Sequence, residues 1–177
     1  KEAEDRPLFM STAGPGSSSH FMSELVIDAA NLPADVVHFN GGGEAATNLM
    51  GGHADTYIST TASVMPYVND GRLKALAVLA PERFELLPDV PSSGEAGISG
   101  VDINGWVAMF GPAGMDPALV EKINADLAKA MASDTMKEQL EQNFAVAGKL
   151  TPDEFKDVYL RDLKTWKNLA EKRGIGQ

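Results

Sequence analysis

The sequence predicts an α/β fold in which helices cover the faces of a parallel sheet. The first observation behind this prediction is an alternation, over residues 6–79, between short apolar runs and longer segments with helical periodicity, a pattern typical of parallel βαβ units. The second is that glycine, serine and threonine gather where strands give way to helices, as turns require. With 177 residues, 44% of them hydrophobic, the chain suits one domain or two small lobes.

The elements of this alternating part follow one another at short intervals. We expect strands at residues 8–10, 36–39, 56–59 and 73–79, and helices at residues 18–30, 44–50 and 62–69. In the first helix, apolar residues recur at i, i+3, i+4 and i+7, which places them on one face and predicts that this face is buried. The residues of that face are Met22, Leu25, Val26 and Ala29.

The rest of the chain is expected to be a connector followed by helices. Residues 81–105 are rich in proline, glycine and serine, the composition of a connector, and an apolar strand is expected at 106–110. A helix begins at Asp116-Pro117, a second covers 134–142, and the last begins with the capping box of Thr151 and Glu154. The apolar stripes are Val120, Ile123, Leu127 and Met131 in the first of these helices and Phe155, Tyr159, Leu163, Trp166 and Ala170 in the last.

Loop 1, residues 12–19, connects the first strand to the first helix and has the composition of an anion-binding turn. Its glycines allow a sharp turn and a close approach of backbone to ligand, its serines offer hydroxyl donors, and the helix that follows presents free N–H groups and the positive end of its dipole. The residues expected to contact a ligand here are Thr12, Gly14, Gly16, Ser17, Ser18 and Ser19. A turn of this kind also serves simply to cap a helix.

Two further loops are expected beside loop 1, because the carboxyl ends of parallel strands meet at one edge of a sheet. Loop 2, residues 40–44, follows the second strand, and loop 3, residues 59–61, follows the third. The expected ligand contacts in these loops are Gly42, Gly43, Glu44, Ser59 and Thr60. The second glycine-rich turn favours ligand binding over simple capping.

Charge narrows the ligand class. The net charge is -10, and no lysine or arginine lies between Arg6 and Arg72, so an anion bound here depends on N–H groups, hydroxyls and helix dipoles. Glu44 competes for the dipole of its own helix, which favours a carboxylate over a densely charged phosphate. The acidity argues against nucleic acid as a partner, and no apolar run reaches the roughly 20 residues that span a bilayer.

Other chemistry is weakly supported. The three histidines are isolated from one another and cysteine is absent, so we expect no metal site, no cofactor and no disulfide. A hydrolase using Ser18, His20 and Asp55 is an alternative, but the chain has no nucleophile elbow; His20 is expected instead to pack under loop 1 or to hydrogen-bond its backbone. Asp55 is expected to anchor a strand through backbone N–H groups, and the alternative is that it orients a water molecule toward the ligand. A ligand-sensing regulatory domain is the remaining alternative.

Several segments, in this order, resemble the substrate-binding proteins of tripartite tricarboxylate transporters, the TctC or Bug family. They are Gly14-Pro15-Gly16-Ser17-Ser18-Ser19-His20, His38-Phe39-Asn40-Gly41-Gly42-Gly43-Glu44-Ala45, Gly51-Gly52-His53-Ala54-Asp55, Gly71-Arg72-Leu73-Lys74-Ala75-Leu76-Ala77-Val78 and Leu87-Pro88-Asp89-Val90-Pro91. The resemblance implies a type II Venus-flytrap fold like that of periplasmic binding proteins. It also implies a periplasmic, non-enzymatic protein that captures an organic di- or tricarboxylate and passes it to a membrane permease.

Family members are longer than this chain, and the resemblance implies that the opening segment of the first lobe is missing here. Residues 1–104 would then form the second lobe with its half of the ligand site, and residues 105–177 the mostly helical part that returns to the first lobe. The expected partners are the carboxylate, the permease subunits, and either the missing segment or a second copy of the chain. Many relatives carry lysine and proline near loop 2, where this chain has Asn40 and Glu44.

Overall fold

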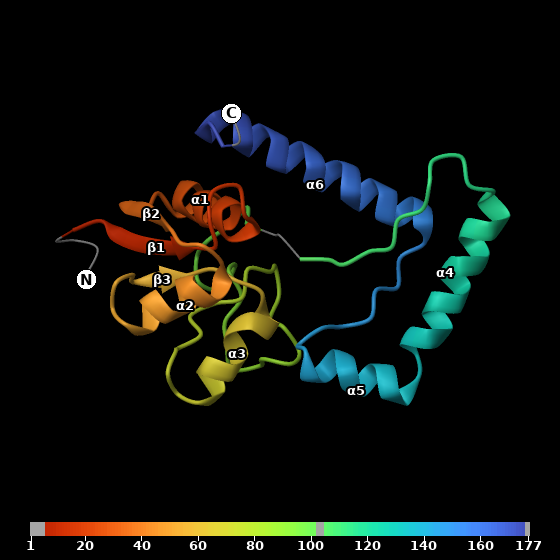
Figure 1. Cartoon of the computed structure of the whole chain (residues 1–177), viewed down its shortest axis with the longest axis horizontal. Coiled ribbons are helices and arrows are strands. Elements are labelled where there is room, and N and C mark those ends of the chain that lie inside the picture. The colour runs from red at the N-terminus through yellow and green to blue at the C-terminus, as the bar shows by residue number, and fades with distance from the viewer. Residues whose placement is uncertain (1–5, 102–104, 176–177) are drawn as a thin grey trace. The chain divides into compact units, whose positions relative to one another are not determined.

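The computed structural model describes residues 6–101 and 105–175 (Figure 1). These fall into two compact units, one made of residues up to 105 together with residues from 166 onward, and the other made of residues 106–165. We call them the sheet unit and the helical unit. The expected boundary at residue 104 lies outside the described residues.

A parallel three-stranded sheet organises the sheet unit. Its strands are β1 (Leu8–Thr12), β2 (Ala34–His38) and β3 (Thr56–Tyr57), and its helices are α1 (Ser18–Ala30), α2 (Gly42–Met50) and α3 (Thr61–Asn69). The strand order is β2-β1-β3, so β1 is central (Figure 1). Met10 pairs with Val36 on one side and Thr56 on the other, both in parallel register. The predicted parallel α/β architecture is confirmed.

Helix α1 has the predicted bounds but not the predicted buried face. Ser17 caps its start and Asn31, in the left-handed conformation at φ 47°, ends it. The buried residues of α1 are Ser19, His20, Ser23 and Val26, whereas Ala29 is exposed. The buried face is therefore rotated toward loop 1, because Ser19 and His20 pack inward to hydrogen-bond that loop.

Two predicted strands are wrong. In residues 73–79 the pairing is limited to one isolated bridge between Val78 and Ser92, and no strand forms at residues 106–110. Both segments have the apolar composition of a strand, but a strand also needs a neighbour that pairs with its N–H and C=O groups. The described part of the chain supplies no such neighbour for 106–110. The expected third strand, 56–59, shortens to two residues for the same reason.

The helical unit contains α4 (Pro117–Met131), α5 (Asp134–Gln142) and the first part of α6 (Pro152–Arg173). The predicted helix starts are confirmed: Asp116 caps α4, and Glu154 Oε2 accepts the Thr151 N–H at 2.8 Å while Thr151 Oγ1 accepts the Glu154 N–H. The predicted buried stripe of α6 is wrong, since Leu163 is 49% exposed and the buried residue of this helix is Leu169.

An aromatic cluster joins the start of the helical unit to α6. Trp106 lies edge-on to Phe155 with the ring centroids 5.0 Å apart, and Phe110 lies 5.9 Å from Tyr159. The Trp106 indole N–H donates to Asp162 at 2.8 Å. Within the described ranges, no helix combines the length and apolar character needed to cross a membrane.

Candidate functional site

Loop 1 begins at the buried carboxyl end of β1 and is in direct contact with His38 and Phe39, the two residues before loop 2. Thr12 is completely buried, and its Oγ1 hydrogen-bonds His38 Nδ1 at 2.7 Å. The Phe39 N–H donates to the Thr12 carbonyl at 3.0 Å. Gly14 has φ 122°, and a Cβ there would lie 3.3 Å from the Phe39 carbonyl oxygen, so this position requires glycine.

Two of the three serines in loop 1 hold the loop itself together. Ser17 Oγ donates to the Gly14 carbonyl at 2.7 Å and accepts the His20 N–H at 3.2 Å. Ser19 Oγ accepts the Ala13 N–H at 2.8 Å and lies 3.0 Å from Ser17 Oγ. Both hydroxyls are committed to internal hydrogen bonds, so their role toward a ligand is to fix the loop.

Ser18 is different. Its side chain is exposed, and its hydroxyl has no hydrogen-bond partner among the residues that the structure describes. Its N–H group and that of Ser19 lie in the first turn of α1, where the helix provides no acceptor, while the next two N–H groups are both bonded to Ser17. Among the described residues, one hydroxyl and two N–H groups at the start of α1 therefore have no acceptor.

His20 lies under loop 1, as the sequence predicted, and contacts its backbone. The Gly16 N–H donates to His20 Nδ1 at 3.1 Å. His20 is 8% exposed, and its ring centroid lies 4.5 Å from that of His38. Burial, followed by repulsion from His38, lowers the pKa of His20, while Glu24 acts in the opposite direction. The neutral imidazole is the form that fits this position.

Loop 2 brings the start of α2 close to β3. The Asn40 N–H donates to Glu44 Oε2 at 3.0 Å, so the Glu44 carboxylate closes the loop and leaves a negative charge at the start of α2. A Cβ on Gly42 would lie 2.9 Å from the Tyr57 hydroxyl oxygen, whereas one on Gly43 would meet nothing. Gly42 is therefore needed for packing against Tyr57, and Gly43 leaves its side of the loop open.

Loop 3 adds hydroxyls at the same edge. Thr60 is the residue before α3, and its Oγ1 lies 2.7 Å from Ser63 Oγ rather than capping the helix. Ser59 is half-buried. The structure thus places the expected contacts of all three loops at or after the last residues of β1, β2 and β3, at the carboxyl edge of the sheet.

The hydrolase alternative needs three residues that the structure does not bring together. Asp55 Oδ2 accepts the Phe9 N–H at 2.8 Å, and both Asp55 oxygens accept Arg6 N–H groups at 2.7 Å. The hydrogen bond from Arg6 lowers the pKa of Asp55 to about 2. His20 instead binds Gly16, and Ser18 hydrogen-bonds neither of them. The expectation that Asp55 anchors a strand is confirmed.

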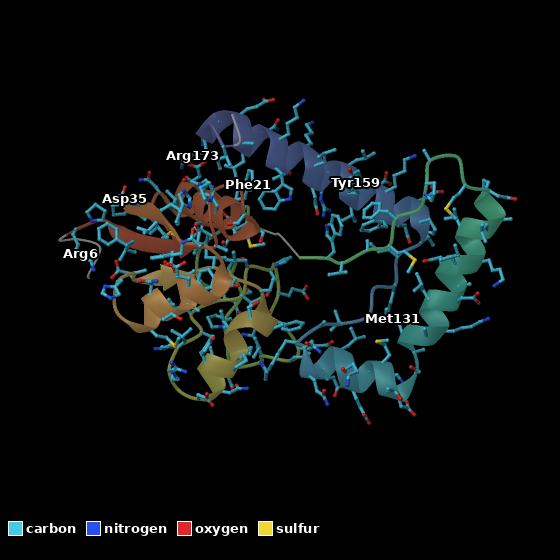
Figure 2. The ribbon with its side chains drawn as sticks, in the orientation of Figure 1. Arg6, Phe21, Asp35, Met131, Tyr159 and Arg173 are labelled. Atoms are coloured by element: carbon cyan, nitrogen blue, oxygen red, sulfur yellow. The ribbon has the colours of Figure 1, made fainter. Side chains whose placement is uncertain are left out.

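Two cations of the sheet unit are already paired with carboxylates. Arg173, labelled on α6 in Figure 2, binds Glu24 with Nε and Oε2 3.1 Å apart and also contacts Asp28. Lys172 Nζ lies 2.6 Å from Asp28 Oδ2. Across residues 6–101 and 105–175, no three histidine, aspartate or glutamate side chains gather to hold a metal ion.

Comparison with known proteins identifies relatives of this chain. The family model described as the tripartite tricarboxylate transporter family receptor, TctC, matches residues 3–175. A Pseudomonas sp. protein named for its place in the tcbD-tcbE intergenic region is 30% identical over 172 residues, which are 96% of this chain and 51% of that protein. The chain therefore spans about half the length of the curated relatives it matches.

Solved structures share the fold. A TctC solute binding protein from Polaromonas has a TM-score of 0.81 at 27% identity, covering 97% of this chain and 59% of that one. MatC from Rhodopseudomonas palustris, solved with bound malate, has a TM-score of 0.76 at 26% identity, covering 95% of this chain and 58% of MatC. The predicted fold class, that of periplasmic binding proteins, is confirmed. The division into lobes stays a prediction.

Proposed function

Because the chain belongs to the tripartite tricarboxylate transporter receptor family, we propose that it binds a small organic di- or tricarboxylate at loops 1, 2 and 3. The observation that carries this proposal is the set of donors at the start of α1. Loop 1 uses the Ser17 and Ser19 hydroxyls in internal hydrogen bonds, yet leaves the Ser18 hydroxyl and the N–H groups of Ser18 and Ser19 without an acceptor among the described residues. A carboxylate oxygen is the acceptor that these groups fit.

Neutral donors and helix dipoles carry the binding in this proposal. Helices α1 and α2 both start at the carboxyl edge of the sheet, and each helix end contributes about 0.3–1 kcal/mol toward an anion. The sequence between Arg6 and Arg72 adds no cation. Glu44 adds a negative charge at the start of α2, which disfavours phosphate more than a carboxylate.

The biological role that we infer is capture and delivery. Family members are solute-binding proteins, and MatC is one relative whose structure contains malate. For this chain we propose a periplasmic location and delivery of the bound carboxylate to the permease subunits of a tripartite transporter. We further propose that residues 1–104 contribute the second lobe's half of the site. On this basis, the chain alone binds citrate and C4 dicarboxylates more weakly than about 1 µM, because closure between two lobes is what buries the ligand.

The test is an NMR titration of the chain with malate and with citrate at millimolar concentration. We expect the amide signals of Ser18 and Ser19 to shift most. Ser18→Ala should weaken binding by about 1 kcal/mol, one hydrogen bond. Ser18→Asp should abolish it, because the new carboxylate occupies the N–H groups of α1, while thermal stability holds or rises slightly.

The matched control is Ser133→Asp, which adds the same charge at the start of α5 in the helical unit. It should leave carboxylate binding unchanged. If Ser18→Asp binds malate or citrate as well as the parent chain does, loop 1 is only a helix cap and the proposed function fails.

A further inference from the structure

We propose that His20 is a positioning residue for loop 1, and that its neutral imidazole holds the carboxylate donors in place and releases them when it is protonated. This inference rests on the proposed function, since the ligand is the carboxylate of that site. His20 itself does not contact the ligand. It acts through Gly16.

The geometry ties His20 into loop 1 at two points. Its side-chain Nδ1 accepts the Gly16 N–H at 3.1 Å, and its backbone N–H donates to Ser17 Oγ at 3.2 Å. Gly16 has φ 73°, a conformation that glycine adopts without strain. The two contacts lie immediately before Ser18, so they fix the direction in which the Ser18 and Ser19 N–H groups point.

A ring nitrogen accepts a hydrogen bond only when it carries no proton. The contact with Gly16 therefore requires the tautomer protonated at Nε2, and Nε2 lies 3.8 Å from Glu24 Oε1. Protonation of Nδ1 turns this acceptor into a second donor that faces the Gly16 N–H. The two donors repel each other, and the backbone at Gly16 must move away.

The charged groups around His20 determine the pH at which its imidazole is protonated. Central strand β1 has no charged side chain. Strand β2 contributes His38, which lies beside the His20 ring, and Asp35, which lies near the other end of β2. Helix α1 contributes Glu24 and Asp28, which are paired with Arg173 and Lys172 of α6. The Glu24 charge is thus shared with Arg173 and attracts a proton to His20 less strongly than a free carboxylate would. Burial and His38 keep the pKa of His20 below its ordinary value of 6.5.

The experiment measures the loop and the ligand separately from about pH 8 to about pH 5, across the ordinary titration of histidine. Without ligand, NMR follows the hydrogen-exchange protection factor of the Gly16 amide and the ¹⁵N shifts of the His20 ring. With malate, titration gives the dissociation constant. The variants are His20→Asn, whose amide oxygen replaces Nδ1 as an acceptor that does not titrate, and His20→Leu, which has no acceptor. The control is His53→Asn, which removes an exposed histidine.

In the parent chain we expect Gly16 protection to fall as His20 becomes protonated, with malate affinity falling about tenfold, the equivalent of one hydrogen bond. His20→Asn should keep both values nearly constant, apart from the ionisation of malate itself, which affects every variant alike. His20→Leu should lose Gly16 protection at all pH values while Val26 in α1 stays protected. His53→Asn should match the parent.

The inference is overturned if Gly16 protection does not depend on pH, or if His20→Asn keeps the parent's pH profile, which would assign the effect to His38. Failure of the proposed function looks different. In that case neither malate nor citrate shifts the Ser18 and Ser19 amides at about pH 8, although Gly16 still responds to His20. That outcome overturns the release of a carboxylate and supports control of the loop alone.

Discussion

The sheet unit and the helical unit differ in what they bury. In the sheet unit, Met10 is 3% exposed, Ala45 is completely buried and Val101 is completely buried. In residues 106–165 no residue is buried, and the apolar side chains of Val107, Met109 and Phe110 are 103%, 67% and 64% exposed. Among its described residues, the helical unit has the apolar side chains of a core but buries none of them.

Helix starts and buried cores depend on different parts of the sequence. Helices in both units start at local signals in the sequence, the glycine- and serine-rich turn before α1 and the Asp116 cap of α4 among them. Burial requires a second surface, and in the sheet unit the parallel strands of β1 and β2 provide it. A helix start is therefore set within a few residues, whereas a core depends on contacts between distant segments.

The largest expected effect concerns the apolar surface of the helical unit. Large exposed apolar patches mark surfaces that associate with a partner, and we expect the chain to form dimers at tens of micromolar, an ordinary strength of association. Val107→Asp should weaken this association at least about tenfold, because it places a charge on a fully exposed apolar position. Light scattering coupled to size-exclusion chromatography measures the mass.

Leu76→Asp is the matched control for this prediction, because Leu76 is a 64% exposed apolar residue in the sheet unit. It should leave the association unchanged. A parent chain that remains monomeric at these concentrations contradicts the prediction. The exposed apolar side chains of the helical unit would then not cause the chain to associate with itself.

A second, smaller effect concerns the contact of the Asp55 carboxylate with Arg6 and with the Phe9 N–H in the sheet unit. Asp55→Asn removes the charge that binds Arg6 and Phe9, and we expect the free energy of unfolding to fall by about 1–2 kcal/mol, discounted because Arg6 is half exposed. Since the folded pKa of Asp55 is about 2 and its ordinary value is 3.8, this contribution is complete above 3.8 and is lost as pH falls through about 2. Urea unfolding followed by circular dichroism measures it.

Asp89→Asn, at an exposed carboxylate of the same unit, is the control and should change the free energy of unfolding by less than about 0.5 kcal/mol. Equal losses in the two variants would mean that the Asp55 contact does not stabilise the sheet.

The same division between local and non-local explains how far the sequence predicts the structure. The helices at 18–30 and 134–142 agree with α1 and α5 because their caps are local. The strand predicted at 106–110 fails because no property of those residues reveals whether a pairing neighbour exists. In the candidate site, composition identified loop 1 but did not reveal that Ser17 and Ser19 bond within the loop while Ser18 does not. Hydroxyl direction depends on the folded backbone.

The smallest expected effect lies in α6, the helix whose residues are divided between the two units. In the sheet unit Arg173 pairs with Glu24 and Asp28, whereas in the helical unit the one described ion-pair partner of Arg161 is its neighbour Asp162. Arg173→Gln should lower the free energy of unfolding by about 0.5–1 kcal/mol at low salt, and by less at high salt because ions screen partly exposed pairs. Arg161→Gln should have no measurable effect. Urea unfolding at two salt concentrations compares them.

The Arg173 variant has a second readout that a general loss of stability does not produce. Without Arg173, the Glu24 carboxylate is left to attract a proton to His20, so the pKa of His20 should rise relative to the parent. Ring ¹⁵N shifts measure this directly. The tie through Asp28, whose pKa is lowered mainly by its hydrogen bond from Lys172, is complete above the ordinary value of 3.8 and is lost as pH falls through the lower folded value. If Arg161→Gln and Arg173→Gln lower the free energy of unfolding equally, the ion pairs of Arg173 stabilise α6 no more than the Arg161–Asp162 pair does. The burial of Leu169 would then not be accompanied by stronger ion pairs in the sheet unit.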